Sequence, residues 1–263
     1  MIPRRYITEW KEYAPWPNDA QVEQDLVIER ALVQLFSSPF LKEQLAFRGG
    51  TALHKIFLKP QVRYSEDIDL VQIKQGPIKP ILQEIRKQLD FLGTKRNIKQ
   101  NENMNTVTYR FESEIPPIIN LRLKIEINCR EHFTVFGYQE IEHSLNNGWF
   151  SGNCKINSFV LEELLSTKLR ALYQRRKGRD LFDLYYALSH LELDTDKLVD
   201  GFKKYMEFSV KQPPSQKKFI QNMDLKMEDP DFGGDIYALL RPGVKYNQQE
   251  AYKLIKREII EKL

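Results

Sequence analysis

The alternation of apolar and polar residues marks three strands in the first half of the chain. The most regular one runs from Leu121 to Cys129, with its apolar residues on one face and its polar residues on the other. Val107–Phe111 alternates in the same way. Glu66–Ile73 also alternates, and it places Asp67 and Asp69 on the face opposite its aliphatic residues. We therefore expect a sheet in this half of the chain.

A periodicity near 3.6 residues predicts helices around these strands. The helical ranges are 20–36, 51–57, 78–89, 160–173, 180–190, 196–207 and 248–263. Asp19 is a candidate N-cap for the first helix, and Ser158 or its neighbour for the fourth. Residues 1–18 are interrupted by prolines and are expected to form an irregular arm, and Ala46–Arg48 is expected to form a short strand.

The pattern changes near residues 150–158, from mixed strands and helices to helices alone. An α/β half that is followed by a helical half indicates two domains. We therefore expect an α/β domain over residues 1–155 and a mostly helical domain over residues 156–263.

The composition is that of a globular protein able to bury a core. Of the 263 residues, 41% are hydrophobic and 29% are charged, and the formal net charge is +4. This mildly basic balance is compatible with a nucleotide or nucleic-acid partner but does not by itself indicate one. Cys129 and Cys154 lack the spacing of a zinc site or a disulfide framework. Because no segment resembles a signal peptide or a membrane helix, we expect a cytoplasmic protein without a membrane partner.

Residue types that carry chemistry gather in one stretch of the first half. Gly49, Gly50 and Thr51 lie at a strand-to-helix turn, where backbone N–H groups can face an anion. Asp67 and Asp69 are two apart on a strand, so both point to one face, and Mg²⁺ takes one or two carboxylates together with substrate phosphates. Each feature alone also fits an ordinary turn or a solvated strand face. Together they predict phosphoryl or nucleotidyl transfer.

Two further residues are candidates for the same site. Glu126 lies on the polar face of its strand, where it could be a general base, a second metal ligand, or the partner of a neighbouring lysine or arginine. Lys168 falls inside an apolar helical stripe, and lysine is rarely buried without a partner. It could contact a triphosphate in a cleft, or form a structural salt bridge with Asp180 or Asp183 of the following apolar helix. Arg176 and Arg179 are alternative partners for these two acids.

Four sequence blocks together resemble the AbiEii/MenT group of nucleotidyltransferase-like toxins, within the DNA polymerase β-type superfamily. The blocks are GG-T-x-L…R-x-S-x-D-I-D-L, K-x-E-I-N, L-x-T-K-L-R-A-L and K-G-R-D-L-F-D-L-Y, and the resemblance covers residues 20–190. The combination is far more specific than any single block. The resemblance implies an α+β fold, in which an α/β nucleotidyltransferase domain with a mixed sheet is followed by a mostly helical C-terminal domain. It also implies a nucleotide in the cleft between them.

The first block carries the resemblance to the metal and nucleotide site. By motif position, Asp67 and Asp69 match the metal-binding acids of the family. Gly49, Gly50 and Thr51 match its nucleotide-binding glycine turn, although the wider superfamily usually has serine where this chain has Gly50.

The remaining matches concern single residues. Ser65 matches a hydroxyl position of the nucleotide site that is modified in some relatives to switch off activity. Lys168 matches the lysine expected to hold the triphosphate, and Asp183 matches the aspartate of the fourth block, with Asp180 as the alternative. Glu126 rests on strand order rather than on a tight motif.

The sequence as a whole predicts a Mg²⁺-dependent nucleotidyltransferase, with Mn²⁺ as the alternative cation, that transfers a nucleotide from an NTP to an acceptor hydroxyl and releases pyrophosphate. By resemblance, the acceptor is the 3′ end of a tRNA or another RNA, and the protein is the toxin of a toxin–antitoxin system with a cognate antitoxin as partner. Two alternatives stay open: a transferase of AMP or phosphate to protein, and a catalytically silent nucleotide- or RNA-binding module. The basic run Arg175–Arg179 fits RNA phosphates or a solvated loop.

Overall fold

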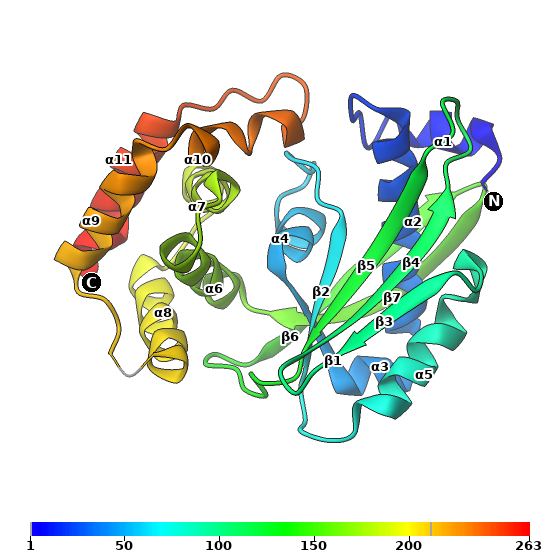
Figure 1. The fold of residues 1–263 in the computed structure, drawn as a ribbon, viewed down its shortest axis with the longest axis horizontal. Helices are drawn as coiled ribbons and strands as arrows, with labels where there is room; N and C mark the ends of the chain where they lie inside the picture. The colour runs from blue at the N-terminus through cyan, green and yellow to red at the C-terminus, as the bar shows by residue number, and fades with distance from the viewer. Residues whose placement is uncertain (1, 211) are drawn as a thin grey trace. The chain divides into compact units, whose positions relative to one another are not determined.

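The computed structural model describes residues 2–210 and 212–263. The chain divides into two compact units. Unit 1 comprises Tyr138–Phe159 and the described residues up to Phe133, and unit 2 comprises Thr134–Gly137 and the described residues from Val160 onward. Unit 1 holds the sheet, and unit 2 holds helices (Figure 1). The expected α+β class, with helices in the C-terminal part, is confirmed.

Unit 1 is built on a seven-stranded mixed sheet of order β3-β4-β5-β2-β1-β7-β6. The strands are β1 Leu45–Arg48, β2 Asp67–Gln72, β3 Arg96–Gln100, β4 Met104–Glu112, β5 Asn120–Asn128, β6 Tyr138–Asn147 and β7 Phe150–Phe159. β2 runs parallel to β5 and β1 runs parallel to β7, while the other neighbours are antiparallel. The central position of β2 places its residues between the longer β5 and the short β1.

The helices of unit 1 pack mainly against one face of this sheet. They are α1 Arg4–Trp10, α2 Asp19–Ser37, α3 Pro39–Gln44, α4 Gly49–Ala52, the π-helical turn η1 Leu53–Phe57, α5 Ile78–Gln88 and the 3₁₀ turn η2 Asp90–Leu92. α2 crosses β5, β6 and β7, and α3 and α5 pack beside it (Figure 1). Ile68, Leu70 and Ile125 of the strands are buried, as the alternation predicts.

Unit 2 is a helical assembly centred on two helices. Its elements are α6 Leu161–Gln174, α7 Gly178–His190, α8 Thr195–Ser209, α9 Gln216–Met227, α10 Pro230–Gly234, η3 Tyr237–Leu239, α11 Gln248–Glu258 and η4 Ile260–Lys262. α6 packs against α7 and α8, and α7 packs against α11. The buried Glu163 accepts hydrogen bonds from the backbone N–H groups of Val135 and Phe136 and from the hydroxyls of Thr134 and Tyr205. These bonds fix residues 134–137 on unit 2.

Some local predictions are wrong. The first residues are not an irregular arm throughout, because α1 forms after Pro3 and buries Ile7. The N-cap of α2 is Asn18 rather than Asp19, in a capping box with Gln21. Ser158 does not cap a helix, since it lies in β7 and its hydroxyl donates to the carbonyl of Phe47.

The pattern also failed to predict the strands β3, β6 and β7 and the helix α9. The buried face of β6 includes His143 and Asn147, and the buried face of β7 includes Ser158. A strand is recognised by the alternation of apolar and polar residues, and polar residues at buried positions interrupt that alternation. β3 is exposed over most of its length, so it has no apolar face to detect. Within the described residues, no helix is both long enough and apolar enough to cross a membrane.

Candidate functional site

The two aspartates of β2 share one face of the sheet with two polar residues of β5. In the parallel register, Asp67 lies opposite Lys124, and Asp69 lies opposite Glu126. All four side chains are on the face turned away from the buried Ile68, and the four residues are partly exposed. This acid face, defined by Asp67, Asp69, Lys124 and Glu126, is where the structure places three of the predicted site residues.

Gly49 is required for the position of the Asp69 side chain. Its φ is +81°, a conformation that residues with a side chain rarely adopt. A Cβ at this position would lie 2.8 Å from Cβ and Cγ of Asp69 and closer still to Oδ2. The glycine turn therefore does more than link β1 to α4, because it makes room for a carboxylate of the acid face.

Thr51 and Ser65 tie the start of β2 to the glycine turn. The Thr51 hydroxyl donates to the backbone carbonyl of Asp67, so its one hydrogen is used. Ser65 is consequently the donor in the 2.8 Å contact between the two hydroxyl oxygens. Thr51 is buried, and so is Gly50. Both hydroxyl side chains thus hold the backbone that carries Asp67.

A buried group of charges anchors the helical segment that follows the turn. Lys55 of η1 contacts Asp25 at 2.6 Å and Glu29 at 3.0 Å, both on α2. His143 lies 2.7 Å from Glu29, and Trp10 donates to Asp25 at 3.0 Å. Burial opposes the charge on Glu29, but Lys55 and His143 outweigh it and lower its pKa to about 2. The turn is therefore fastened to the core of unit 1 by charge pairs as well as by apolar packing.

Burial and the neighbouring carboxylates raise the pKa of Asp67. Burial is the largest cause of the shift of Asp67, whose pKa rises to about 6; Lys124 lowers it, and Asp69, Glu66 and Glu126 raise it. Lys124 lies 2.9 Å from Glu126 and 3.9 Å from Asp67, so one ammonium serves two carboxylates. Negative charges that are crowded in this way favour a bound cation.

The acid face fits a divalent cation through its two aspartates. Asp67 and Asp69 offer carboxylate oxygens on one face, and Gly49 leaves space for the second of them. Across residues 2–210 and 212–263, no group of three or more His, Cys, Asp or Glu side chains is arranged around a metal position. Glu126 contacts Lys124 instead, which is the partner arrangement weighed from the sequence.

The second cluster of predicted residues lies wholly within unit 2. Lys168 of α6 contacts Asp180 at 3.2 Å and Asp183 at 2.9 Å, both on α7. Arg175 donates to both carboxylate oxygens of Asp180, at 2.6 and 2.8 Å. Burial would raise the pKa of Asp180, but Lys168 and Arg175 hold it below its usual value. The structural salt bridge between two helices is therefore present, and a role of Lys168 in holding a triphosphate stays a prediction.

Sequence reasoning overlooked two residues that contact the candidates. Arg175, rather than Arg176 or Arg179, binds Asp180; Arg176 lies 3.4 Å from Asp229. Lys124 is the direct neighbour of Glu126, and its place on the same polar strand face was the signal that could have identified it.

Comparisons with known proteins identify the family and the fold. The sequence profile of the family described as "Nucleotidyl transferase AbiEii toxin, Type IV TA system" matches residues 30–254. The structure is similar to MenT4, a nucleotidyltransferase toxin from Mycobacterium tuberculosis H37Rv, with a TM-score of 0.69 and 15% sequence identity over 100% of this chain and 88% of that one. This similarity concerns the fold.

A second solved structure is less similar. It is an antigenic nucleotidyltransferase-like protein from Paracoccidioides brasiliensis, with a TM-score of 0.44 and 17% identity over 81% of this chain and 94% of that one. No curated protein sequence matches the chain. Because the family profile extends over most of the chain, the protein belongs to the AbiEii family of nucleotidyl transferase toxins and is a nucleotidyltransferase.

Proposed function

We propose that this nucleotidyltransferase is a Mg²⁺-dependent toxin that transfers a nucleotide from an NTP to the 3′ hydroxyl of a tRNA, with release of pyrophosphate. The observation that supports it most is the acid face, where Asp67 and Asp69 lie on one face of the sheet and the missing side chain of Gly49 leaves room for the Asp69 carboxylate. The family membership supplies the reaction class and, through the name of its toxin–antitoxin type, an antitoxin as a partner.

The proposed roles of the residues follow from their positions. Asp67 and Asp69 hold the cation, which supplies positive charge to the triphosphate. Thr51 and Ser65 hold the backbone of Asp67 in place, so their contribution is to position the acid. Glu126 is engaged with Lys124, and this pair sets the charge beside Asp67.

The proposal of an RNA acceptor draws on the charge of the chain. The formal net charge of +4 is compatible with RNA. In the basic run, Arg175 donates hydrogen bonds to Asp180. The other basic residues of the run lie where α7 begins: Arg176, Lys177 and Arg179. Arg176 and Lys177 are exposed, and Arg176 also lies 3.4 Å from Asp229, so Lys177 is the more accessible of the two to phosphates.

A labelling experiment separates the alternatives. The purified full chain is incubated with Mg²⁺ and each of the four NTPs, labelled at the α-phosphate, in the presence of total tRNA. The proposal predicts label on tRNA that depends on Mg²⁺ and is absent with γ-labelled NTP, since pyrophosphate leaves. Label on protein alone would indicate a protein-modifying transferase. Nucleotide binding without transfer to any acceptor would indicate a silent binding module. Either of these results would overturn the proposed acceptor.

A further inference from the structure

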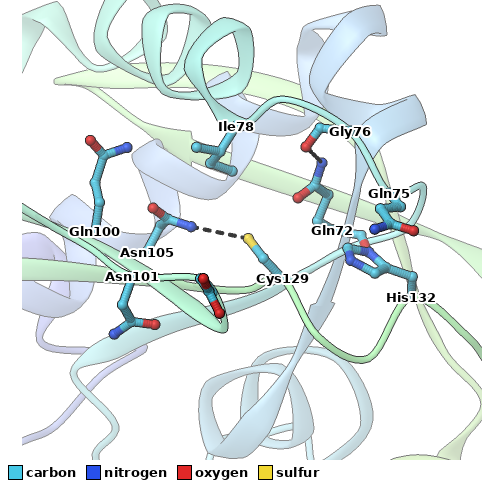
Figure 2. Close-up of a pocket in the computed structure, with 10 residues that line it drawn as sticks. Gln72, Gln75, Gly76, Ile78, Gln100, Asn101, Asn105, Cys129 and His132 are labelled. Atoms are coloured by element: carbon cyan, nitrogen blue, oxygen red, sulfur yellow. Dashed lines mark hydrogen bonds between the residues drawn. The ribbon is translucent and has the colours of Figure 1, made fainter.

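A cavity of about 420 Å³ opens at the end of the sheet in unit 1 (Figure 2). It is lined by Gln72, Gln75, Gly76, Ile78, Gln100, Asn101, Glu102, Asn105, Cys129 and His132. Most of these side chains are neutral hydrogen-bonding groups, and none of the lining residues is a lysine or an arginine. Its size is within the range of small-molecule sites in proteins.

The cavity is separate from the acid face. Gln72 is the last residue of β2, and its side chain lies on the same face as Ile68 and Leu70 because side chains alternate along a strand. That face is opposite to the one that carries Asp67 and Asp69. Cys129 directly follows β5, and the alternation of the strand places its side chain on the same face as the buried residues of β5. The reaction assigned to the acid face therefore does not account for this cavity.

Two buried residues at the cavity, Gln72 and Asn105, each donate one amide hydrogen to the protein, while their amide oxygens accept none from the residues that the structure describes. Gln72 is 2% exposed, and its Nε2 donates to the carbonyl of Gly76 at 3.0 Å. Asn105 is 3% exposed, and its Nδ2 donates to Sγ of Cys129 at 3.2 Å (Figure 2). Among the described residues, neither Oε1 of Gln72 nor Oδ1 of Asn105 accepts a hydrogen bond. Neither oxygen is among the fully enclosed side-chain atoms that have no partner, so both are open to solvent, which N–H groups of a ligand would replace.

His132 adds a third acceptor. Its Nδ1 lies 2.7 Å from the backbone carbonyl of Gln72, and because a carbonyl can only accept, Nδ1 carries the hydrogen. Nε2 of the neutral ring is then an acceptor. The cavity thus combines three acceptors with the apolar side chain of Ile78 and, at its exposed rim, the rotatable amides of Gln100 and Asn101.

We propose that this cavity binds a nucleobase that carries an exocyclic amino group, such as cytosine or adenine. The amino group donates to the acceptors of the cavity, and the rim amides pair with the ring nitrogens and oxygens, as Asn and Gln do with base edges. Because no basic side chain lines the cavity, the phosphates stay outside. The base belongs either to a free nucleoside or to an unpaired nucleotide of an RNA. The proposal does not depend on the function assigned to the acid face.

Cys129 provides a direct probe of occupancy. The thiol lines the cavity, whereas the other cysteine, Cys154, is buried and has its pKa raised by burial to about 12, so it stays protonated. Burial also raises the pKa of Cys129, so alkylation by N-ethylmaleimide is followed at mildly alkaline pH by mass spectrometry of the full chain. Cytidine is expected to slow this alkylation at least about tenfold more than uridine, which has a carbonyl oxygen in place of the amino group.

Variants test the acceptors one at a time. His132→Phe keeps a ring but removes Nε2, and Asn105→Leu removes the amide oxygen; both are expected to lose the protection by cytidine. Thermal melting shows whether each variant is folded, and His132 is the safer change because its side chain is only partly buried. Gln75→Ala is the control: Gln75 lines the cavity but is exposed, so this variant is expected to keep the preference for cytidine over uridine.

An oligocytidylate distinguishes the two sources of the base. If it protects Cys129 at much lower concentration than cytidine, the site takes a base of RNA; if cytidine protects as well as the oligonucleotide, the site takes a free nucleoside. Equal protection by uridine and cytidine would overturn the proposal, and so would unchanged alkylation in the presence of every nucleoside and oligonucleotide.

Discussion

The acid face of unit 1 and the unit 2 cluster, formed by Lys168, Arg175, Asp180 and Asp183, both combine carboxylates with basic side chains, but in different surroundings. In unit 1, Lys124 is shared between Asp67 and Glu126, and burial with neighbouring carboxylates raises the pKa of Asp67 to about 6. In unit 2, Lys168 contacts both Asp180 and Asp183, and the two carboxylates are almost fully buried. Arg175 adds a second cation, and the pKa of Asp180 is lowered despite its burial.

The difference teaches how a candidate site is separated from a structural ion pair. Partly exposed carboxylates that lie close to other carboxylates repel one another, and a bound cation relieves this repulsion. Carboxylates that are buried and matched by protein cations are already satisfied, and they hold the two helices together at the expense of desolvation. We therefore propose cation binding at Asp67 and Asp69, and we expect the unit 2 cluster to act chiefly on stability.

Loss of the acid face should have the largest effect. Asp67→Asn combined with Asp69→Asn is expected to lower nucleotidyl transfer by at least about 10³-fold, because the charge that holds the cation is removed. The melting temperature should stay the same or rise, since like charges no longer repel. Glu66→Gln is the matched control: Glu66 is also an acid next to Asp67, but it is exposed and lies 3.8 Å from Arg122. Equal losses in both variants would remove the distinction between these acids.

Breaking the unit 2 cluster should act on stability first. Lys168→Met leaves two buried carboxylates without its ammonium group, and Asp183→Leu removes one of the two carboxylates that the buried Lys168 contacts, so each should destabilise the protein by about 3–5 kcal/mol in denaturant unfolding. The double variant should lose less than the sum, because both members of the pair are gone.

Activity in that double variant then decides the role of Lys168. If it folds and retains transfer, the cluster is structural. If it folds but has lost transfer as fully as the double aspartate variant of unit 1, Lys168 has a direct role with the triphosphate, and the comparison between the two units fails.

Glu23 shows what burial does to the pKa of a carboxylate. Its side chain on α2 is buried, and burial raises its pKa to about 7. The folded chain therefore keeps a proton that the unfolded chain releases, so stability should fall as pH rises from about 4.5 to 7. Glu23→Gln should be neutral near pH 4 and stabilising by about 1–2 kcal/mol near pH 8, as measured by thermal unfolding across this range. A gain that is independent of pH would contradict the assigned cause.

The smallest effect is expected at the hydroxyl pair that positions β2. Thr51→Val leaves the carbonyl of Asp67 without its donor and should destabilise the protein by about 1–2 kcal/mol. Ser65→Ala should cost less, because the bond from Thr51 to Asp67 is kept. A double-mutant cycle should show coupling between the two, measured both as unfolding free energy and as transfer rate. Strict additivity would mean that the two hydroxyls do not act together.

The strands that carry the acid face could be predicted because their cores are apolar. β2 and β5 alternate cleanly, so the side on which Asp67, Asp69 and Glu126 lie followed from the sequence alone. What the sequence could not give is the register, which places Lys124 opposite Asp67 and Glu126 opposite Asp69. Register depends on pairing between distant segments rather than on local periodicity.

The unit 2 cluster was predictable in part for a related reason. Lys168 on an apolar stripe and two aspartates on an apolar helix must find partners when they are buried. The partner Arg175 was not identified, because the choice among neighbouring arginines depends on how the chain turns between α6 and α7. The cavity beside Gln72 was not predicted at all, since amide side chains carry no periodic signal and β3 and the turn after it were not recognised.

Binding of Mn²⁺, followed by electron paramagnetic resonance as the cation is titrated into the full chain, tests the assignment of the acid face most directly. Wild type and Glu66→Gln are predicted to bind the ion with similar affinity, while Asp69→Asn is predicted to lose that binding without a change in melting temperature. Binding by Asp69→Asn that is as tight as that of wild type would contradict the assignment.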